Sequence, residues 1–325
     1  MKNSILRQIT VATLFGSAVL GAHAQSSVTV YGLLDLSVGQ FQAPGAAAQN
    51  AVESGKMTTS YYGFKGSEDL GGGLSANFAL EGFLRADDGS AGRFNGDAQF
   101  SRTASVGLSG GFGSVNLGRN TTSLFVNSLA FNAFGDSFGF SPTIRHYFTS
   151  GTTTGDTAWN DSIKYNSPKF GGASFTVHTA LGEGNGGSNT GVSGQYSGGP
   201  LALGVAWQKV EKGLVEKDTT TWQIGGSYDA SVAKVFAQYG VVDNDTTGNS
   251  YKILGLGTSI PVGAGKVIAQ WGRISPDTGS TRATISLGYD HNLSKRTDAY
   301  FVLMNDKIDG LATGNNYAVG IRHRF

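Results

Sequence analysis

The sequence has no cysteine, only six prolines and, after its N-terminal stretch, no long apolar run. Without cysteine the 325-residue chain has no disulfide framework, and a chain of this length does not need one to fold. A membrane-spanning helix needs about 20 consecutive apolar residues, and no segment after residue 24 reaches that length. These absences exclude a disulfide-stapled small domain and a helical membrane protein.

Neither sign of charge is in clear excess. The chain has 24 lysines and arginines against 23 aspartates and glutamates. Removing residues 1–24 takes away Lys2 and Arg7, which leaves 22 basic residues against 23 acidic ones and a net charge of −1. Nucleic-acid-binding domains carry a basic patch or stripe, so we expect no nucleic acid among the partners.

The N-terminus has the pattern of a secretory signal peptide. Lys2 and Arg7 precede an apolar stretch at residues 9–21, and Ala22-His23-Ala24 matches the small-x-small cleavage rule. The apolar stretch is too short for a spanning helix. We therefore predict a signal peptide at residues 1–24 and a single mature domain at residues 25–325.

Glycine is abundant, with 50 residues that fall at the ends of alternating runs. Aromatic and β-branched residues recur between the glycines, which argues against a disordered linker and favours strands joined by hairpin turns. The alternation predicts sixteen strands, at residues 28–38, 58–67, 74–85, 100–108, 112–119, 161–167, 173–181, 190–197, 200–208, 219–229, 231–240, 249–259, 264–272, 281–290, 296–304 and 315–325.

The connections between these strands alternate in length. Short turns occur at residues 109–113, 197–200, 229–230 and 261–265, and longer polar loops separate them. Outer-membrane barrels have short periplasmic turns and long external loops. An even number of strands also places both termini on the periplasmic side.

Alternation predicts which way the strand residues face. The C-terminal strand has an apolar face and a small or basic face, made of Tyr317, Val319, Ile321, His323 and Phe325 and of Ala318, Gly320, Arg322 and Arg324 respectively. Residues 74–85 repeat the pattern, with Asn77, Glu81 and Arg85 opposite the apolar face. A soluble sandwich would alternate too, but would bury its apolar face. The signal peptide, the turn–loop asymmetry and the terminal aromatic favour the membrane barrel.

Several segments resemble the general porins of Gram-negative bacteria, particularly the β-proteobacterial branch. They span the mature chain and comprise Ser27-Val28-Thr29-Val30-Tyr31-Gly32, Gly63-Phe64-Lys65-Gly66-Ser67-Glu68-Asp69-Leu70-Gly71, Val106-Gly107-Leu108-Ser109-Gly110-Gly111-Phe112-Gly113, Leu293-Ser294-Lys295-Arg296-Thr297 and Val319-Gly320-Ile321-Arg322-His323-Arg324-Phe325. The resemblance implies an all-β fold: a 16-stranded antiparallel transmembrane β-barrel, assembled as a homotrimer, with a long third loop that folds inward. That loop would run from about residue 120 to 160, and its length is typical of a functional loop.

The resemblance also implies a constriction where loop acids face wall arginines. Asp136 stands where the loop acid is expected, and Arg102 stands at a wall-arginine position, although its parity with Val106 would point it outward. Two expected wall arginines are replaced, by Tyr61 and Ala158. Alternation places further candidate charges on the lumen side, namely Arg85, Lys164 and Arg282 with Glu81.

Three further expectations follow from the resemblance. Arg119, at the root of the long loop, would receive an acid from a neighbouring subunit, with Asp87 or Asp88 in that part, unless it is an ordinary surface arginine. Terminal Phe325 resembles the aromatic that the barrel-assembly machinery recognises, or is a plain girdle residue. The other expected partners are outer-membrane lipid and lipopolysaccharide and small hydrophilic solutes.

The sequence therefore predicts a passive, water-filled channel in the outer membrane. More bases than acids are expected in the lumen, which predicts a mild anion preference. Alternatives are a substrate-specific porin for organic acids or for sugars, the latter with an aromatic slide of Tyr61, Tyr62 and Trp159, and a non-conducting adhesin or enzyme barrel. The Gly-x-Ser-x-Gly pattern at residues 107–111 falls in a hairpin, where hydrolases need a strand-to-helix turn. We expect no enzyme activity, cofactor or metal.

Overall fold

A computed structural model describes residues 27–213 and 218–325, so the predicted signal peptide lies outside the described residues. Its strands are β1 (Ser27–Phe41), β2 (Gln49–Ser54), β3 (Tyr61–Gly71), β4 (Leu74–Arg85), β5 (Ser90–Ala91), β6 (Thr103–Gly110), β7 (Gly113–Thr121), β8 (Ala158–Asn166), β9 (Ala173–Ala180), β10 (Asn189–Gly198), β11 (Leu201–Val210), β12 (Thr219–Asp229), β13 (Lys234–Asn244), β14 (Asn249–Val262), β15 (Gly265–Pro276), β16 (Arg282–Asn292), β17 (Thr297–Ile308) and β18 (Gly314–Arg324). Two helices, α1 (Ser123–Ala130) and α2 (Pro142–Phe148), lie between β7 and β8.

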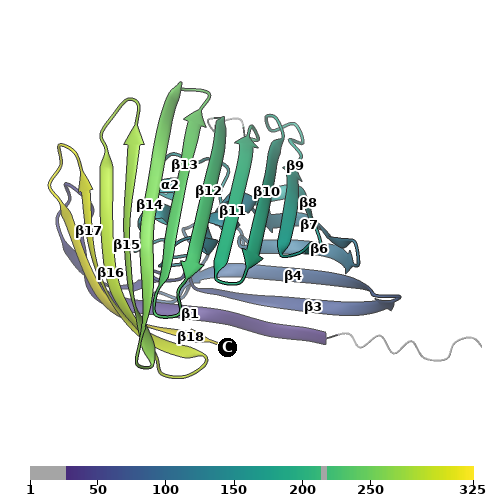
Figure 1. Cartoon of the computed structure of the whole chain (residues 1–325), viewed down its shortest axis with the longest axis horizontal. Coiled ribbons are helices and arrows are strands. Elements are labelled where there is room, and N and C mark those ends of the chain that lie inside the picture. The colour runs from purple at the N-terminus through teal and green to yellow at the C-terminus, as the bar shows by residue number, and fades with distance from the viewer. Residues whose placement is uncertain (1–26, 214–217) are drawn as a thin grey trace, which may run out of the picture.

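The sheet closes on itself, because β1 pairs antiparallel with β18 on one edge and with β3 on the other. Every neighbouring pair round the barrel is antiparallel (Figure 1). Sixteen strands succeed one another round the wall, which confirms the predicted 16-stranded antiparallel barrel. The two further strands, β2 and β5, fall in predicted loops: β2 returns along the end of β1, and the two-residue β5 pairs with the end of β4.

The prediction for residues 58–67 begins three residues early, because the chain leaves β1 between β2 and β3. Ser54 is opposite Leu36 and Tyr61 is opposite Leu33, so residues 55–60 cannot stay in register and project into the barrel. The buried carboxylate of Asp35 holds this projection. It accepts hydrogen bonds from the backbone N–H groups of Met57 (2.7 Å) and Thr58 (2.8 Å).

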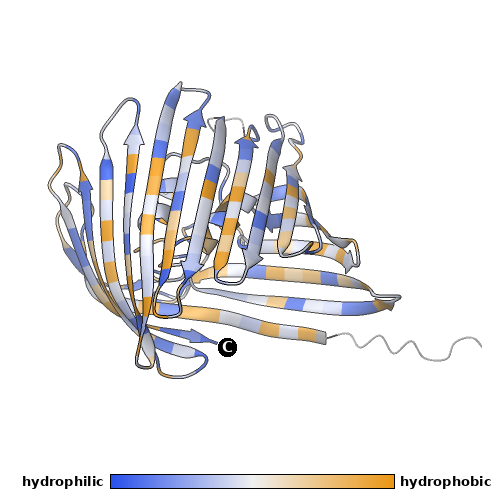
Figure 2. Ribbon diagram, viewed as in Figure 1, coloured by the Kyte–Doolittle hydropathy of each residue, from blue (hydrophilic) through white to orange (hydrophobic). Residues whose placement is uncertain are grey.

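The wall is apolar outside and polar inside. Exposed large side chains alternate along the strands with buried polar ones, so β12 presents Ile224 outward and buries Gln223. Figure 2 shows this as alternating hydrophobic and hydrophilic bands along β11 to β16. A soluble sandwich would have the reverse arrangement, so the structure resolves the ambiguity that the sequence pattern left open. None of the described helices is long and apolar enough to cross a membrane.

The connection between β7 and β8, residues 122–157, folds inside the barrel and is called the inner loop below. Figure 1 shows its helix α2 behind β13 and β14. Thr122 caps α1 by accepting a hydrogen bond from Phe125 N, and Ser141 caps α2 in the same way from Ile144 N. Pro142 at the first position of α2 has the backbone angle that a helix start requires.

Glycines on the inner wall let the inner loop approach closely. A Cβ added at Gly225 or Gly204 would collide with the ring of Phe131, and one added at Gly255 would collide with Thr143. At Gly272 it would lie 2.7 Å from Pro142 Cβ. These glycines form the seat of the inner loop on the wall.

We expect Gly225→Val to displace the inner loop, because the new side chain would occupy the space of Phe131. Overpacking of this kind costs about 1–3 kcal/mol, so the variant should unfold at a lower temperature and conduct more current per channel. Gly226→Val is the matched control, since its Cβ would contact only the outward Leu203 at 3.1 Å and Ala202 O at 3.6 Å. Equal single-channel currents for the native protein and Gly225→Val would contradict the claim that these glycines let the inner loop approach the wall.

Candidate functional site

Buried glutamines of β12, β13 and β15 anchor the inner loop to the wall. Asn127 of α1 donates to Gln223 (2.8 Å), and Gln223 donates to Ser128 (3.0 Å). Gln238 and Gln270 both donate to the hydroxyl of Thr143, at 3.0 and 2.8 Å. The amide groups of Gln223, Gln238 and Gln270 thus find hydrogen-bond partners on the loop, as buried polar groups require. They hold the loop without placing a charge under it.

An apolar cluster closes the space between the loop and the wall at β15, β17 and β18. It contains Phe134 and Phe140 of the loop, packed with Met57, Ile268, Tyr300, Val302, Met304 and Ala318. Phe131, Phe134 and Phe140 are buried, whereas Phe138 pairs with Phe125 at a ring distance of 5.8 Å on the other side of the loop.

The loop tip is held by the projecting segment between β2 and β3. Lys56 O accepts hydrogen bonds from Gly139 N (3.0 Å) and Ser137 Oγ (2.7 Å). Thr58 Oγ1 donates to the carboxylate of Asp136 at 3.0 Å. Burial raises the pKa of this Asp136 carboxyl, and the Thr58 hydrogen bond and the charge of Arg102 offset only part of that effect.

A cavity of about 590 Å³ lies between the inner loop and the wall at β4, β7 and β8, and is called the constriction cavity below. The loop contributes Asp136, Phe125 and Phe138. The chain around it contributes the cations Arg85, Arg93, Arg102 and Lys164. Of the six predicted constriction residues, Arg85, Arg102 and Asp136 line this cavity. Charges on opposite sides of a narrow lumen act on passing solutes through a low-dielectric surround.

Glu81 and Tyr61 lie next to this cavity through their contacts with Arg102. The guanidinium pairs with Glu81, and it lies 4.0 Å from the centre of the Tyr61 ring. Glu81 also accepts a hydrogen bond from Tyr31 Oη at 2.5 Å. Parity alone would point Arg102 outward. Because β6 begins only at Thr103, the alternation does not extend to Arg102, and the side chain lies on the lumen side.

Arg282, the sixth predicted residue, lies on the other side of the inner loop. Its guanidinium pairs with Asp306 (2.5 Å) and donates to Ser150, and Arg145 of α2 pairs with the same carboxylate (3.0 Å). The side chain therefore fastens α2 to the wall and does not line the constriction cavity. Arg322 makes a similar cluster, with Asp290 (2.8 Å) and Asp298 (2.7 Å).

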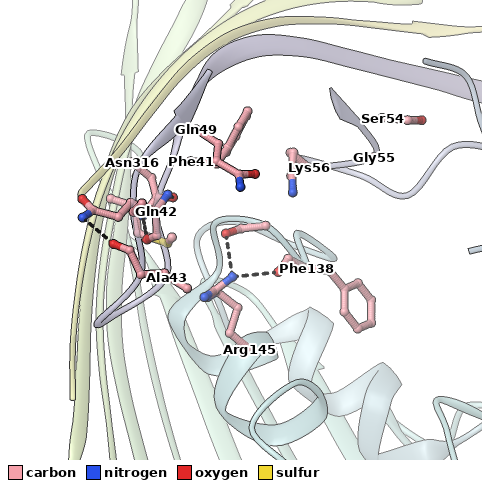
Figure 3. A pocket seen from close by; sticks show the side chains of 14 residues that line it. Phe41, Gln42, Ala43, Gln49, Ser54, Gly55, Lys56, Phe138, Arg145 and Asn316 are labelled. Carbon is pink, nitrogen blue, oxygen red and sulfur yellow. Dashed lines mark hydrogen bonds between the residues drawn. The ribbon is translucent and has the colours of Figure 1, made fainter. Parts of the chain in front are cut away.

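A second cavity, of about 460 Å³, lies beside the loop tip (Figure 3). Phe41, Lys56 and Asn316 line it together with Phe138 and Arg145 of the inner loop. Arg145 donates to the carbonyl of Gly139 at 3.2 Å, which fixes the backbone of the tip. The tip thus separates two aqueous spaces in the barrel.

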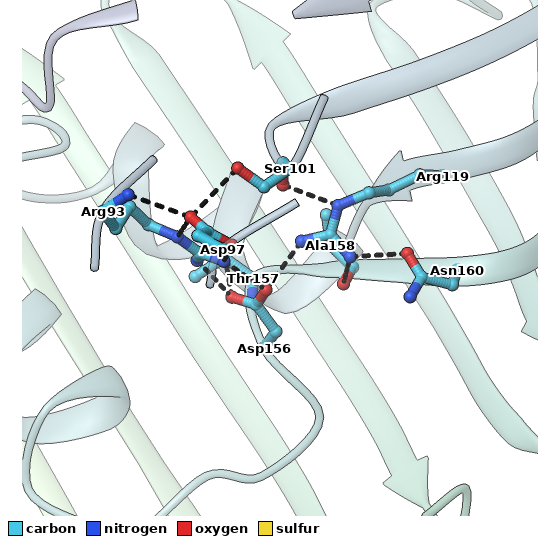
Figure 4. Close-up of polar contacts among 8 residues, drawn as sticks. All are labelled: Arg93, Asp97, Ser101, Arg119, Asp156, Thr157, Ala158 and Asn160. Carbon is cyan, nitrogen blue, oxygen red and sulfur yellow. Dashed lines mark hydrogen bonds and ion pairs between the residues drawn. The ribbon is translucent and has the colours of Figure 1, made fainter. Parts of the chain in front are cut away.

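Arg119 forms an ion pair within its own chain, with a residue that sequence reasoning missed. Asp156, at the end of the inner loop, accepts from Arg119 (2.6 Å) and from Arg93 (2.9 Å). Arg93 also pairs with Asp97 (2.9 Å), so the loop between β5 and β6 is fastened to the root of the inner loop (Figure 4). Predicted partners Asp87 and Asp88 are exposed, and Asp88 accepts from Ser90 N.

The Arg93–Asp97–Asp156–Arg119 cluster stays ionised in mild acid. Burial alone would raise the pKa of Asp97, but hydrogen bonds from Arg93 and Ser101 and the charge of Arg93 lower it to about 2. The same balance lowers the pKa of Asp156. Because both values are depressed, the stability from these pairs is present above the ordinary aspartate pKa and is lost only as the pH falls towards 2.

A closed barrel with an apolar exterior, a polar lumen and a loop that narrows the lumen is the architecture of an outer-membrane diffusion channel. A family model described as Gram-negative porin matches residues 9–311. The chain belongs to that family. It is an outer-membrane porin, through which small hydrophilic solutes pass passively.

Individual relatives match along almost the whole chain. Outer membrane porin protein 32 of Delftia acidovorans is 34% identical over an alignment covering 100% of both proteins. Major outer membrane protein P.IB of Neisseria meningitidis serogroup B is 26% identical and covers 95% of this chain and 97% of that protein. The solved anion-selective porin from Comamonas acidovorans superposes with a TM-score of 0.82 at 30% identity, covering 92% of this chain and 100% of that one.

We expect Asp156→Asn to loosen both loops, because one carboxylate bridges two arginines. Hydrogen bonds to charged groups contribute about 1.5–3 kcal/mol each, and partial exposure of Asp156 reduces this, so we expect a loss of about 1–2 kcal/mol. Heat-induced unfolding followed by circular dichroism measures it. The control is Asp277→Asn, which removes an exposed pair with Lys252 and should have little effect. Equal unfolding temperatures for the two variants would contradict the bridging role.

Proposed function

We propose that this porin is a homotrimeric diffusion channel with a mild preference for anions. The observation that carries the proposal is the charge balance of the constriction cavity. Arg85 and Lys164 face it without an ion pair to any described carboxylate, since Arg85 donates to Asn95 (2.7 Å) and Lys164 to Thr121 O (2.8 Å). Asp136 is the one acid that lines the cavity.

The other charges at this level largely cancel. Arg102 is compensated by Glu81, and Arg93 and Arg119 share Asp97 and Asp156. Two uncompensated cations therefore face one carboxylate, so the cavity carries a small positive excess. Such an excess raises the local concentration of anions and lowers that of cations. The similarity to the anion-selective porin from Comamonas acidovorans also supports a preference for anions.

A sugar-specific channel fits the described residues less well. Its aromatic slide would need Tyr61, Tyr62 and Trp159 to share one lumen surface. Tyr61 lies under Arg102, but Tyr62 packs against the outward Phe64 at a ring distance of 6.5 Å. Trp159 is 2% exposed and stacks on His178. An organic-acid channel agrees with the charge balance and is taken up in the next subsection.

The proposed partners follow from the exterior of the barrel. The apolar outer band suits membrane lipid and lipopolysaccharide, and part of it would be covered in a homotrimer. Asp87 and Asp88 are exposed on the loop after β4 and are available to a neighbour's Arg119. Phe325 is half-exposed beside Gly32 of β1, where the barrel closes. We propose it as the residue that the barrel-assembly machinery recognises.

The function is tested with the folded protein in a planar bilayer. We expect ohmic openings that close in three equal steps, and a reversal potential in a potassium chloride gradient that shows chloride to be more permeant than potassium. Because surface charge is screened by salt, the preference should weaken at high concentration. A more permeant potassium ion would overturn the anion preference, and a protein that inserts without conducting would favour an adhesin or enzyme.

The pH dependence of selectivity tests the part played by Asp136. Its raised pKa means that this carboxyl takes up a proton at a higher pH than an ordinary aspartate. Acidification from pH 7 should therefore increase the chloride-to-potassium permeability ratio. Asp136→Asn should show the higher ratio already at pH 7 and depend less on pH, whereas Asp309→Asn, on an exposed outer loop, should behave like the native protein. An unchanged ratio in Asp136→Asn would contradict this role.

A further inference from the structure

Below the constriction cavity, towards the short turns, the wall contains a separate small cavity of about 180 Å³. It lies between the start of α1 and strands β8, β9 and β10. Its polar lining includes Lys164, Ser123, Asn166, Ser174, Ser193 and Gln195, and no acidic residue lines it. We call it the lysine pocket.

Lys164 is the cation of this pocket, and its position is fixed. The ammonium group donates to Thr121 O at 2.8 Å, and no described carboxylate forms an ion pair with it. An ammonium group has three donors, so donors remain for a ligand. The charge is therefore held in place but not neutralised.

The start of α1 adds a second attraction for negative charge. The helix begins at Ser123 and has no acidic residue in its first turn, so the positive end of its dipole is not compensated from within the helix. Ser123 is 5% exposed, and its hydroxyl has no hydrogen-bond partner. A buried hydroxyl without a partner costs free energy, and this one belongs to a residue that lines the lysine pocket.

The lysine pocket adjoins the path that solutes take. Lys164 and Val126 line both this pocket and the constriction cavity. An anion in the constriction cavity is therefore already next to the ammonium group. The pocket volume of about 180 Å³ leaves room for a small oxyanion.

We propose that Lys164 and Ser123 form a binding site for small oxyanions, such as phosphate or a short-chain carboxylate, immediately beyond the constriction. The site rests on the proposed anion-preferring channel and gives it a preferred class of solute. An oxyanion presents several oxygen atoms at fixed positions, so separate oxygens accept hydrogen bonds from the ammonium group and from a hydroxyl group. A solute that pauses there reduces the current of other anions.

The test is block of the chloride current by added phosphate, and separately by acetate, at pH 7 in a planar bilayer. We expect saturable block of the native channel. Lys164→Met should raise the half-blocking phosphate concentration at least tenfold, Lys164→Arg should retain block, and Ser123→Ala should weaken it a few-fold. The matched control is Lys65→Met, which removes a lumen cation stacked on Tyr31 and should leave block unchanged. Block by phosphate but not acetate would assign the site to phosphate; block by both would assign it to oxyanions in general.

Phosphorus-31 line broadening by the detergent-solubilised protein provides a readout that does not depend on conduction. Native protein and Lys65→Met should broaden the phosphate line, and Lys164→Met should not. If Lys164 only anchors the root of the inner loop, Lys164→Met will keep both block and broadening, which overturns the site. Absence of block and broadening in the native protein overturns it as well. Preference for potassium together with saturable phosphate block would reject the anion-preferring channel and leave the site standing.

Discussion

The ladder between β1 and β18 is the interaction on which the rest of the structure depends. In the hydrocarbon of a membrane every backbone N–H and C=O group needs a partner within the protein, and this ladder removes the last free edges of the sheet. Closure also gives the two faces of each strand different surroundings. One face meets lipid and is apolar; the other encloses water and can hold buried polar groups such as Gln223 and Asp35.

The polar interior holds two kinds of charged side chain, paired and unpaired. Where the inner loop is attached to the wall, the charges are paired, as with Arg145 and Arg282 on Asp306. Along the opening, Arg85 and Lys164 keep their charges without acidic partners. Attachment of the loop and the proposed anion preference thus depend on different residues. The loop needs both, because its position defines the opening that the free charges act on.

Much of the barrel follows from the sequence, and the exceptions have physical reasons. Period-two alternation with glycine at the turns locates all sixteen wall strands. It misses β2, because the pairing there depends on a backbone projection held by the distant Asp35 and Tyr300. The alternation also fails to identify the inner face of β17. Tyr300, Val302 and Met304 point inward but are covered by the inner loop, so both faces of that strand are apolar. The acids Asp298 and Asp306 on the same strand were consequently not recognised as lumen residues.

The candidate site was harder to predict than the wall. Arg102 is found only through the family resemblance, since it precedes its strand, and Arg282 faces inward as alternation predicts but lies under α2. Asp156 carries no sequence signal for its role, because its two arginines are 63 and 37 residues away. Contacts set by loop conformation leave no period in the sequence.

The seat of the inner loop also has a consequence for the order of folding. Phe140 O accepts from Ser286, 146 residues further along the chain, and Phe134 and Phe140 pack on residues of β17 and β18. Most of these partners lie far along the chain from the loop, and contacts of such sequence separation form late. We therefore expect the inner loop to narrow the lumen only after the barrel has closed. A barrel whose inner loop had not packed against the wall would be a wide, unselective channel in the outer membrane.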